Sequence, residues 1–410
     1  MTVMEKESGK RFSLRQLFEG DGMIWGIMIF LCFASMMLIY SAASGQLFDP
    51  VTRHNLMPYI KSHGLWLFIG IVVAVVVQHL DYRSIAPYSR LCYIFALALL
   101  FVTILMGRSS GGVQRSLSIF GREVQTFYVV VLLVIIYAAH AIARFGKRIN
   151  DIKKVYIPFL VLIGIVCVGI MTQNFSTALI LLLTCMFMLF ISELKFKYLL
   201  ATAGVLAAIF ILLVATSGFG IRALDRFQTV HARVERFFDK DETEDLHSRL
   251  AHMTNEQVDN IRQDVLVEGA VSTGGILPVN GPGSSIFRGT AQIYSDCIFA
   301  IAVEEYGVLI SCLLIAAYLL LFYRVFLLLQ NVPTPFGAYL AGGLGFWIVF
   351  QAVVHISVCV GAFPNTGQTL PMVSWGNASI MVTSVSFGLL LNISKSRKKD
   401  KSQMKGVEDE

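Results

Sequence analysis

Charged residues are scarce in this chain: only 15% of its 410 residues are Asp, Glu, Lys or Arg, whereas 56% are hydrophobic. Ordinary soluble domains carry about 25% charged residues, so this composition excludes a soluble globular protein. The apolar residues come in blocks of roughly 20, the helix length that crosses a bilayer. The sequence therefore predicts an all-α, polytopic integral membrane protein.

Several familiar site motifs are also missing. The seven cysteines show no Cys-x-x-Cys or Cys/His metal spacing, so we expect buried small hydrophobic residues and no structural metal site. No small-residue cleavage site follows the first apolar run, which we therefore expect to remain as a span. The glycine-rich stretch 272–285 lacks the spacing and the Gly-Lys-Ser/Thr ending of a Walker phosphate loop.

The apolar blocks predict about ten transmembrane helices. They cover residues 23–42, 63–80, 91–106, 125–143, 156–171, 175–192, 199–217, 297–329, 337–361 and 369–392. Lysine and arginine gather in an amino-terminal tail (1–20), in the loop 144–154 and in a carboxyl-terminal tail (394–410). Ten spans place all three on one side of the cytoplasmic (inner) membrane, and the positive-inside rule predicts that both termini are cytoplasmic. This pattern accounts for the net charge of +6 without a nucleic-acid partner.

Within the predicted membrane domain (21–393), one connection is long and polar: the loop 218–295, which this topology places outside the cell. We expect an interfacial helix over 224–238 and a second helix over 254–271. The glycine-rich turn that follows exposes backbone N–H groups at Gly281 and Gly283, beside Ser285. Such a turn can hold an anion, although a plain loop is the alternative.

Three acids lie where this loop meets the eighth span, in the stretch IYSDCIFAIAVEEYG (293–307). Asp296 is placed at the outer edge of the membrane, where a partly desolvated carboxylate could act as a general base. On a continuous helix, Glu304 leans to a similar side and Glu305 points nearly opposite. We expect structural support from Glu305 and leave Glu304 open, and we expect His355 to be a satisfied bundle histidine.

A second polar segment, CVGAFPNTGQTLPMVSWGN (359–377), combines prolines and glycines. Irregular backbone survives at membrane depth only where it is buried or lines a cavity. We therefore expect this segment, with Pro371 and Ser374, to form the second wall of a site that begins at Asp296.

Four ordered motifs resemble the SEDS family (shape, elongation, division, sporulation) of FtsW- and RodA-like proteins, nearly from end to end. They are QNFSTALIL (173–181, which includes Thr177), GAVSTGGILPVNGPGSS (269–285), YSDCIFAIAVEEYG (294–307) and GAFPNTGQTLPMVSWGNAS (361–379). The resemblance implies a peptidoglycan glycosyltransferase that polymerises lipid II, a disaccharide-pentapeptide on undecaprenyl diphosphate. The family's catalytic aspartate falls on Asp296. The implied partner is a class B penicillin-binding protein that supplies the transpeptidase.

The resemblance also suggests what binds the leaving diphosphate, which needs cations or backbone donors. Arg115 occupies the family's arginine position, with a solvated loop arginine as the alternative, and Arg262 and Arg288 are weaker candidates. The loop residues Gly281, Gly283 and Ser285, with Ser374, complete the proposed contacts. Glu304, Glu305, Thr177 and Pro371 are expected to support the site. A divalent cation (magnesium or manganese) would help neutralise the diphosphate, but no ligand cluster specifies one.

The chain departs from the family pattern at several positions. The family's Arg-Trp is Arg115–Ser116, its Glu and Lys in the fourth span are Tyr128 and Val131, and its Pro-Glu before the Thr-Asp block is Ala291–Gln292. Its Pro-Asp is Gln173–Asn174, and its Ser-Tyr-Gly-Gly is Ser374–Trp375–Gly376–Asn377. Loss of both partners of an internal ion pair can be neutral, so the fold is not challenged by the change in the fourth span.

Three readings of the function follow. The carboxyl tail and the 365–371 run are closer to FtsW than to RodA, which predicts septal wall synthesis with other divisome proteins; a role in elongation is the alternative. A lipid II flippase or transporter is less favoured, because the sequence shows no clear internal repeat and its acids cluster at one edge. The departures keep open a weakly active or non-catalytic division scaffold.

Overall fold

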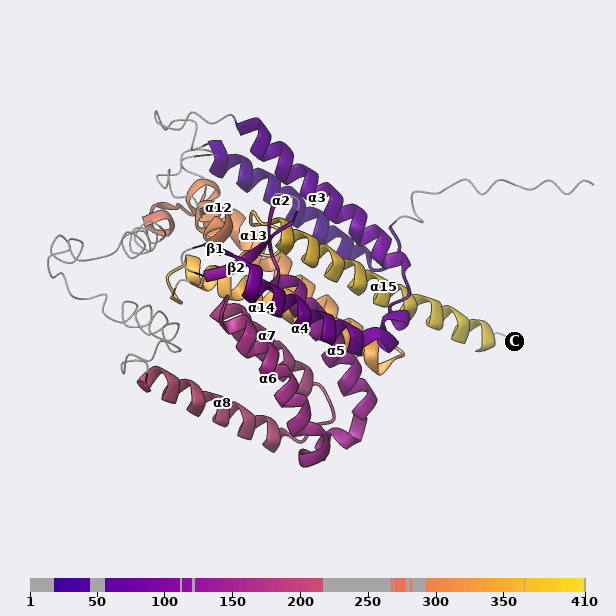
Figure 1. Cartoon of the computed structure of the whole chain (residues 1–410). Coiled ribbons are helices and arrows are strands. Elements are labelled where there is room, and N and C mark those ends of the chain that lie inside the picture. The colour runs from indigo at the N-terminus through magenta and orange to yellow at the C-terminus, as the bar shows by residue number, and fades with distance from the viewer. Residues whose placement is uncertain are drawn as a thin grey trace, which may run out of the picture.

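The computed structural model describes residues 18–44, 56–110, 113–119, 122–216, 267, 269–277, 281, 293–364 and 366–408. In this part of the chain, long apolar helices form one bundle (Figure 1). The helices are α2 (Gly22–Ser44), α3 (Leu56–His79), α4 (Ser89–Met106), α5 (Phe127–Phe145), α6 (Ile157–Met171), α7 (Phe175–Phe190), α8 (Phe196–Thr216), α12 (Ile293–Asp296), α13 (Ile298–Leu329), α14 (Pro335–Cys359) and α15 (Asn377–Glu408).

The predicted all-α membrane fold is confirmed. Each of the ten predicted apolar segments falls on a helix, and in the described residues eight helices are long and apolar enough to cross a membrane. The α7 helix (Phe175–Phe190) and the Phe196–Leu206 part of α8 are shorter apolar helices. The count of ten spans therefore stays a prediction.

Three local features differ from the predicted pattern. The last helix begins at Asn377, because the preceding residues 366–376 form turns and extended backbone. The long α13 is broken at Gly307, which adopts φ 81° and ψ 164°. Between α4 and α5 the chain forms a three-stranded antiparallel sheet of β1 (Arg108–Ser110), β2 (Val113–Ile119) and β3 (Arg122–Gln125), which hydropathy does not reveal.

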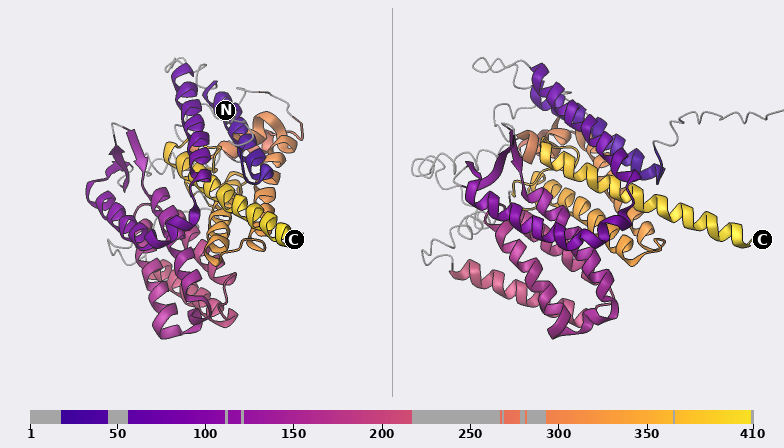
Figure 2. Two further views of the ribbon diagram at one scale, coloured as in Figure 1. Left: turned by 90° about the vertical axis from the view of Figure 1, so that its right-hand side faces the viewer. Right: turned by 45° about the vertical axis from the view of Figure 1, so that its right-hand side comes forward.

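Glycines allow the central helices to approach closely. A Cβ on Gly343 of α14 would lie 2.7 Å from Met188 Sδ of α7 and 2.9 Å from Ile135 Cγ2 of α5. The α15 helix lies along α3 (Figure 1) in the same way, because a Cβ on Gly388 would meet Val77 Cβ at 2.8 Å. Small residues at such contacts supply the van der Waals packing that holds helices together in lipid. The far end of α15 projects beyond the other helices (Figure 2).

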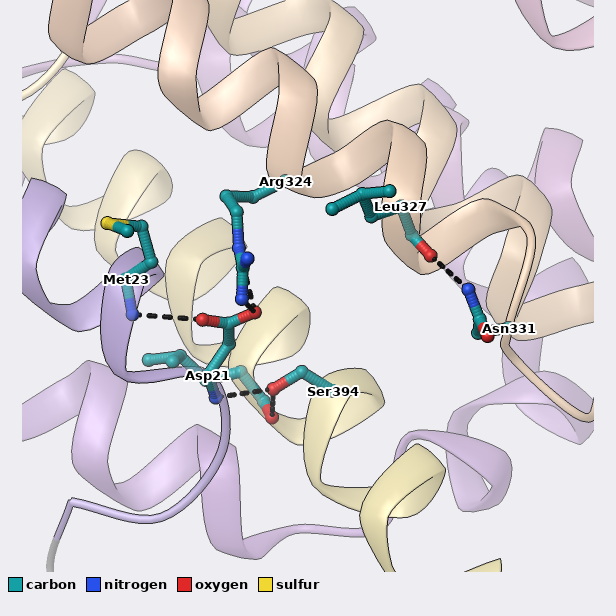
Figure 3. A network of polar contacts seen from close by, with 7 residues as sticks. Asp21, Met23, Arg324, Leu327, Asn331 and Ser394 are labelled. Carbon is teal, nitrogen blue, oxygen red and sulfur yellow. Dashed lines mark hydrogen bonds and ion pairs between the residues drawn. The ribbon is translucent and has the colours of Figure 1, made fainter. Parts of the chain in front are cut away.

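One end of the bundle, which we call the Asp21 end, is tied together by polar contacts (Figure 3). Arg324 of α13 donates from Nε to Asp21 Oδ2 at 3.1 Å, and Asp21 N–H donates to Ser394 Oγ of α15 at 2.8 Å. The Asp21 side chain is only 10% exposed. Beside it, Lys395 pairs with Glu19. These contacts join the start of α2 to the far parts of α13 and α15.

A second contact at the Asp21 end ties α15 to the end of α3. Asn392 Oδ1 accepts from Tyr82 N–H at 3.1 Å, and Asn392 Nδ2 donates to Gln78 O at 2.7 Å and to Leu80 O. The carboxamide therefore binds backbone groups that the end of the helix would otherwise leave unpaired.

Candidate active site

Asp296 lies at the opposite end of the bundle, which we call the Asp296 end. It is the last residue of the short α12, and Cys297 breaks the helix with φ −135° and ψ 23° before α13 begins. The half-buried Asp296 carboxylate therefore lies directly before the first turn of α13, and the amino-terminal end of a helix favours negative charge. Ser295 Oγ donates to Asp296 Oδ1 at 2.6 Å.

The irregular segment 366–376 forms a wall beside Asp296, within the stretch 359–377 whose prolines and glycines predict irregular backbone. Gly367 has φ +63°, and a Cβ built there would lie 3.5 Å from Asp296 Oδ2. Trp375 N–H donates to Tyr294 O at 2.9 Å, and the Trp375 ring stacks on His63 with centroids 5.3 Å apart. The wall is thus fixed directly to α12.

Two residues of the wall carry predicted roles. Ser374 is 1% exposed and its Oγ accepts from Leu370 N–H at 2.8 Å, so in this structure it closes a turn inside the wall. Its predicted contact with substrate stays a prediction. The carbonyl of Pro371 accepts from Tyr318 OH at 2.6 Å, which ties the wall to α13; its supporting role stays a prediction.

A buried polar network continues from Asp296 toward α7. Cys359 Sγ lies 4.0 Å from Asp296 O and 3.5 Å from His355 Nε2. His355 Nδ1 donates to Gln368 O at 2.7 Å. Gln368 Nε2 then donates to Thr177 Oγ1 at 2.9 Å. His355 is fully buried with partners on both nitrogens, as expected for a bundle histidine.

Thr369 is a second centre of this network, which sequence reasoning missed. Tyr128 OH lies 2.7 Å from Thr369 Oγ1, and Ser379 Oγ lies 3.0 Å from the same oxygen. Gln351 Nε2 donates to Thr369 O at 2.9 Å. Tyr128 and Val131 are both buried. Where the family has a Glu and a Lys, this chain thus uses a hydroxyl contact and an aliphatic side chain, which leaves no buried charge to pair at these positions.

The two glutamates lie deeper than Asp296 and are buried, at 1% exposure for Glu304 and 0% for Glu305. Ser41 Oγ of α2 donates to Glu305 Oε2. This contact joins the far end of α2 to α13, and the supporting role of Glu305 stays a prediction. Neither glutamate is positioned by a continuous helix from Asp296, because the backbone breaks at Cys297.

The break at Gly307 is filled by residues from the long loop. Val308 N–H donates to Gly275 O at 3.0 Å, and Leu309 N–H donates to Ile276 O at 3.2 Å. The contact requires glycine, since a Cβ on Gly274 would lie 2.6 Å from Val303 O. The segment 269–277 is therefore attached to the same helix that begins at Asp296.

The remaining predicted contacts are only partly described. Arg115 lies on β2, and the structure describes its backbone alone. Gly281 has φ +74°. Gly283, Ser285, Arg262, Arg288 and the expected helix over 224–238 lie outside the described residues. Within the described ranges no group of three or more His, Cys, Asp or Glu side chains could hold a metal ion.

Comparison with known proteins shows which family has this arrangement of helices and motifs. The family model FTSW_RODA_SPOVE, described as "Cell cycle protein", matches residues 21–399. The chain belongs to this family. The SEDS resemblance seen in the sequence motifs is therefore confirmed, and the family match covers every element that builds the Asp296 end.

Relatives and solved structures agree with this membership. A "Probable peptidoglycan glycosyltransferase FtsW" of Coxiella burnetii is 23% identical over 377 residues, which cover 90% of this chain and 95% of that protein. A protein of the same name from Geobacter sulfurreducens is 25% identical over 88% of this chain and 91% of its own length.

Two solved structures share the fold. The first, described as "Structural coordination of polymerization and crosslinking by a peptidoglycan synthase complex", aligns with a TM-score of 0.69 at 22% identity, over 93% of this chain and 99% of that chain. The second, the Thermus thermophilus rod shape determining protein RodA, aligns with a TM-score of 0.59 at 20% identity, over 92% and 97%.

Proposed function

We propose that this chain is a peptidoglycan glycosyltransferase that polymerises lipid II into glycan strands during cell division. Relatives along nearly the whole chain are named as such enzymes. The observation that carries the proposal is the position of Asp296: a half-buried carboxylate between two helices, beside a wall fixed to α12. A carboxylate at such an edge is accessible to a hydroxyl substrate and is partly withdrawn from water.

In the proposed reaction, Asp296 is the general base. A sugar 4-hydroxyl attacks the anomeric carbon of a second lipid II molecule and passes its proton to the Asp296 carboxylate. The new C–O bond forms as the bond from the anomeric carbon to the undecaprenyl diphosphate breaks, and the diphosphate leaves with the electron pair. The bond from Ser295 Oγ to Oδ1 orients the carboxylate, and Gly367 adds no side chain beside Oδ2.

The leaving diphosphate needs positive charge or N–H donors. We assign this role to Arg115, Arg262 and Arg288 together with the backbone of the glycine-rich turn at Gly281, Gly283 and Ser285. A divalent cation would supply additional charge, but the described residues offer no ligand cluster for one. No step of the proposed reaction depends on it.

The proposed orientation in the membrane, partner protein and cellular location follow from the assignment as a peptidoglycan glycosyltransferase. The Asp296 end faces the outside of the cytoplasmic membrane, and both termini are cytoplasmic. The partner is a class B penicillin-binding protein, in keeping with a fold shared with a chain from a peptidoglycan synthase complex. The chain works at the septum with other divisome proteins. A fluorescent fusion that marks the side wall instead of midcell would assign it to elongation.

The decisive experiment is glycan polymerisation by the full chain, purified with its transpeptidase partner and supplied with lipid II. Asp296→Asn keeps the shape of the side chain and removes the base, so we expect a loss of about a thousandfold. Asp81→Asn is the matched control: Asp81 Oδ1 accepts from Arg83 N–H as a helix N-cap, and asparagine caps equally well.

Other outcomes distinguish the competing functions. Normal polymerisation by Asp296→Asn would refute the proposed base. Rescue of a depletion strain by the same variant would favour a non-catalytic scaffold. Movement of lipid II across liposomes that contain this protein alone would favour a flippase.

A further inference from the structure

Two polar side chains, one in the α6–α7 turn and one in the wall, have no hydrogen-bond partner among the described residues. Gln173 is 2% exposed, and neither its Nε2 nor its Oε1 has a hydrogen-bond partner in the described part of the chain. Thr366 Oγ1 is likewise buried without a partner there. Buried polar atoms in native proteins are nearly always hydrogen-bonded, so each exception needs a reason.

Both residues adjoin the network that begins at Asp296. Gln173 directly precedes Asn174, the N-cap of α7, whose Oδ1 accepts from Gln368 Nε2 at 3.1 Å. Thr366 and Gln368 flank Gly367, the residue beside Asp296 Oδ2. The two unpartnered groups therefore belong to two segments, the α6–α7 turn and the wall, that meet through Gln368.

The fold itself does not explain the carboxamide of Gln173. Its neighbours are satisfied: Asn174 accepts from Thr177 N–H at 3.1 Å, and Gln368 has two acceptors for its Nε2. The corresponding family motif has proline here, so an apolar residue can close this turn. A buried glutamine whose two polar atoms are unpaired within the described residues is costly, and a polar group of a bound substrate would satisfy it.

We propose that Gln173, with the hydroxyl of Thr366, binds the acetamido group of an N-acetylated sugar ring of the substrate. A secondary amide offers one N–H donor and one C=O acceptor, and the carboxamide of glutamine offers one acceptor and two donors. The two groups can therefore pair in both directions. This assignment rests on the proposed function and deepens it, because it makes Gln173 a specificity residue for the sugar.

The test compares lipid II with synthetic lipid II analogues in which a hydroxyl replaces the acetamido group on one or the other sugar. Gln173→Leu keeps the approximate size of the side chain and removes both polar atoms. We expect the wild type to prefer the N-acetylated substrate, and Gln173→Leu to lower kcat/KM for that substrate by about tenfold to a hundredfold. For the analogue that lacks the acetamido group bound by Gln173, the kcat/KM values of the variant and of the wild type should be equal. An equal loss on every substrate, or no loss on any, would overturn the proposal.

Stability provides a second readout. If the carboxamide has no partner within the protein, Gln173→Leu should unfold at the same temperature as the wild type or at a higher one. A clear fall in unfolding temperature would show a structural partner and refute the subsite. Ser89→Ala is the control, because Ser89 Oγ is also buried and unpartnered among the described residues but lies at the start of α4. It should leave the sugar preference unchanged.

Binding separates this proposal from the proposed function. The affinity for lipid II and for the analogues can be measured with purified Asp296→Asn protein, because a binding measurement does not require the substrate to be turned over. If no strand is made by the wild type but Gln173→Leu abolishes the binding preference, the polymerase assignment fails and the subsite stands. If strands are made and the preference is insensitive to Gln173, the subsite fails alone.

Discussion

The two ends of the helix bundle satisfy their polar groups differently. At the Asp21 end, the carboxylate is 10% exposed and pairs with Arg324 while its backbone binds Ser394. At the Asp296 end, the carboxylate is half-buried and the neighbouring Gln173 has no partner in the described residues. Paired polar groups stabilise one arrangement, whereas unpaired groups destabilise the empty protein and are typical of functional sites. Ser89 Oγ at the start of α4 is also unpartnered among the described residues, so the comparison depends on the two carboxylates: one is held by Arg324 and the other is half-buried beside the wall. We expect the Asp21 end to hold the helices and the Asp296 end to meet the substrate.

The largest expected effects come from one substitution at each end: one should abolish activity and spare stability, and the other should lower stability and spare activity. Asp296→Asn should lose about a thousandfold in polymerisation with an unchanged unfolding transition. Arg324→Met should lower the free energy of unfolding by about 3 kcal/mol, because it leaves the Asp21 charge buried without its cation. Activity per folded molecule should stay near that of the wild type. Denaturation in detergent, read beside the polymerisation assay, measures both.

The double variant Asp21→Asn/Arg324→Met provides the control for the ion pair. It removes both charges, so it should be destabilised by less than the sum of the two single variants. Additive losses would show that the two side chains do not act as a pair, and the Asp21 end would then not be held by this contact.

A smaller effect is expected where the loop meets α13. Gly274→Ala places a Cβ 2.6 Å from Val303 O, a backbone atom that cannot move aside, so we expect about 1–3 kcal/mol of destabilisation. Hydrogen exchange should rise at the Val308 and Leu309 amides. Gly164→Ala is the control, because nothing lies within 4 Å of its Cβ position. Unchanged protection in Gly274→Ala would contradict the attachment.

The smallest effect is expected at Tyr128. Tyr128→Phe removes the hydroxyl that contacts Thr369 Oγ1 at 2.7 Å, but Ser379 still reaches that oxygen. We expect a loss of about 1 kcal/mol in the free energy of unfolding and no change in polymerisation rate. A large fall in rate, measured beside Tyr93→Phe as a control for a lost tyrosine hydroxyl, would mean that Tyr128 belongs to the reacting site.

Hydropathy predicted where the helices lie, because it reports the transfer of about 20 residues into lipid. It could not locate the breaks at Cys297 and Gly307, because hydropathy averages over a window about as long as a span and does not report the local backbone conformation. The predicted directions of Glu304 and Glu305 relied on continuous helical geometry from Asp296, which the break at Cys297 removes. The prolines and glycines of 359–377 did point to irregular backbone at membrane depth, and the structure places the wall in the 366–376 part of that stretch.

The hydrogen-bond partners within the site could not be predicted from the sequence. Tyr128 and Thr369 are 241 positions apart, and no local pattern joins two residues so distant. The sequence marked Gln173 as part of a polar pair at the start of the sixth span and as a departure from a motif. It could not show that the side chain lacks a partner within the described residues.

The attachment of the long loop to α13 has a mechanical consequence. The N–H groups of Val308 and Leu309 are paired with Gly275 O and Ile276 O, so the two segments share backbone bonds at the Gly307 break, about three helical turns along the chain from Asp296. A change in the placement of the segment 269–277 would therefore act on the first part of α13. A protein that binds this segment could shift the arrangement of α13 only by its difference in affinity for the alternatives, and it would do so without contacting Asp296.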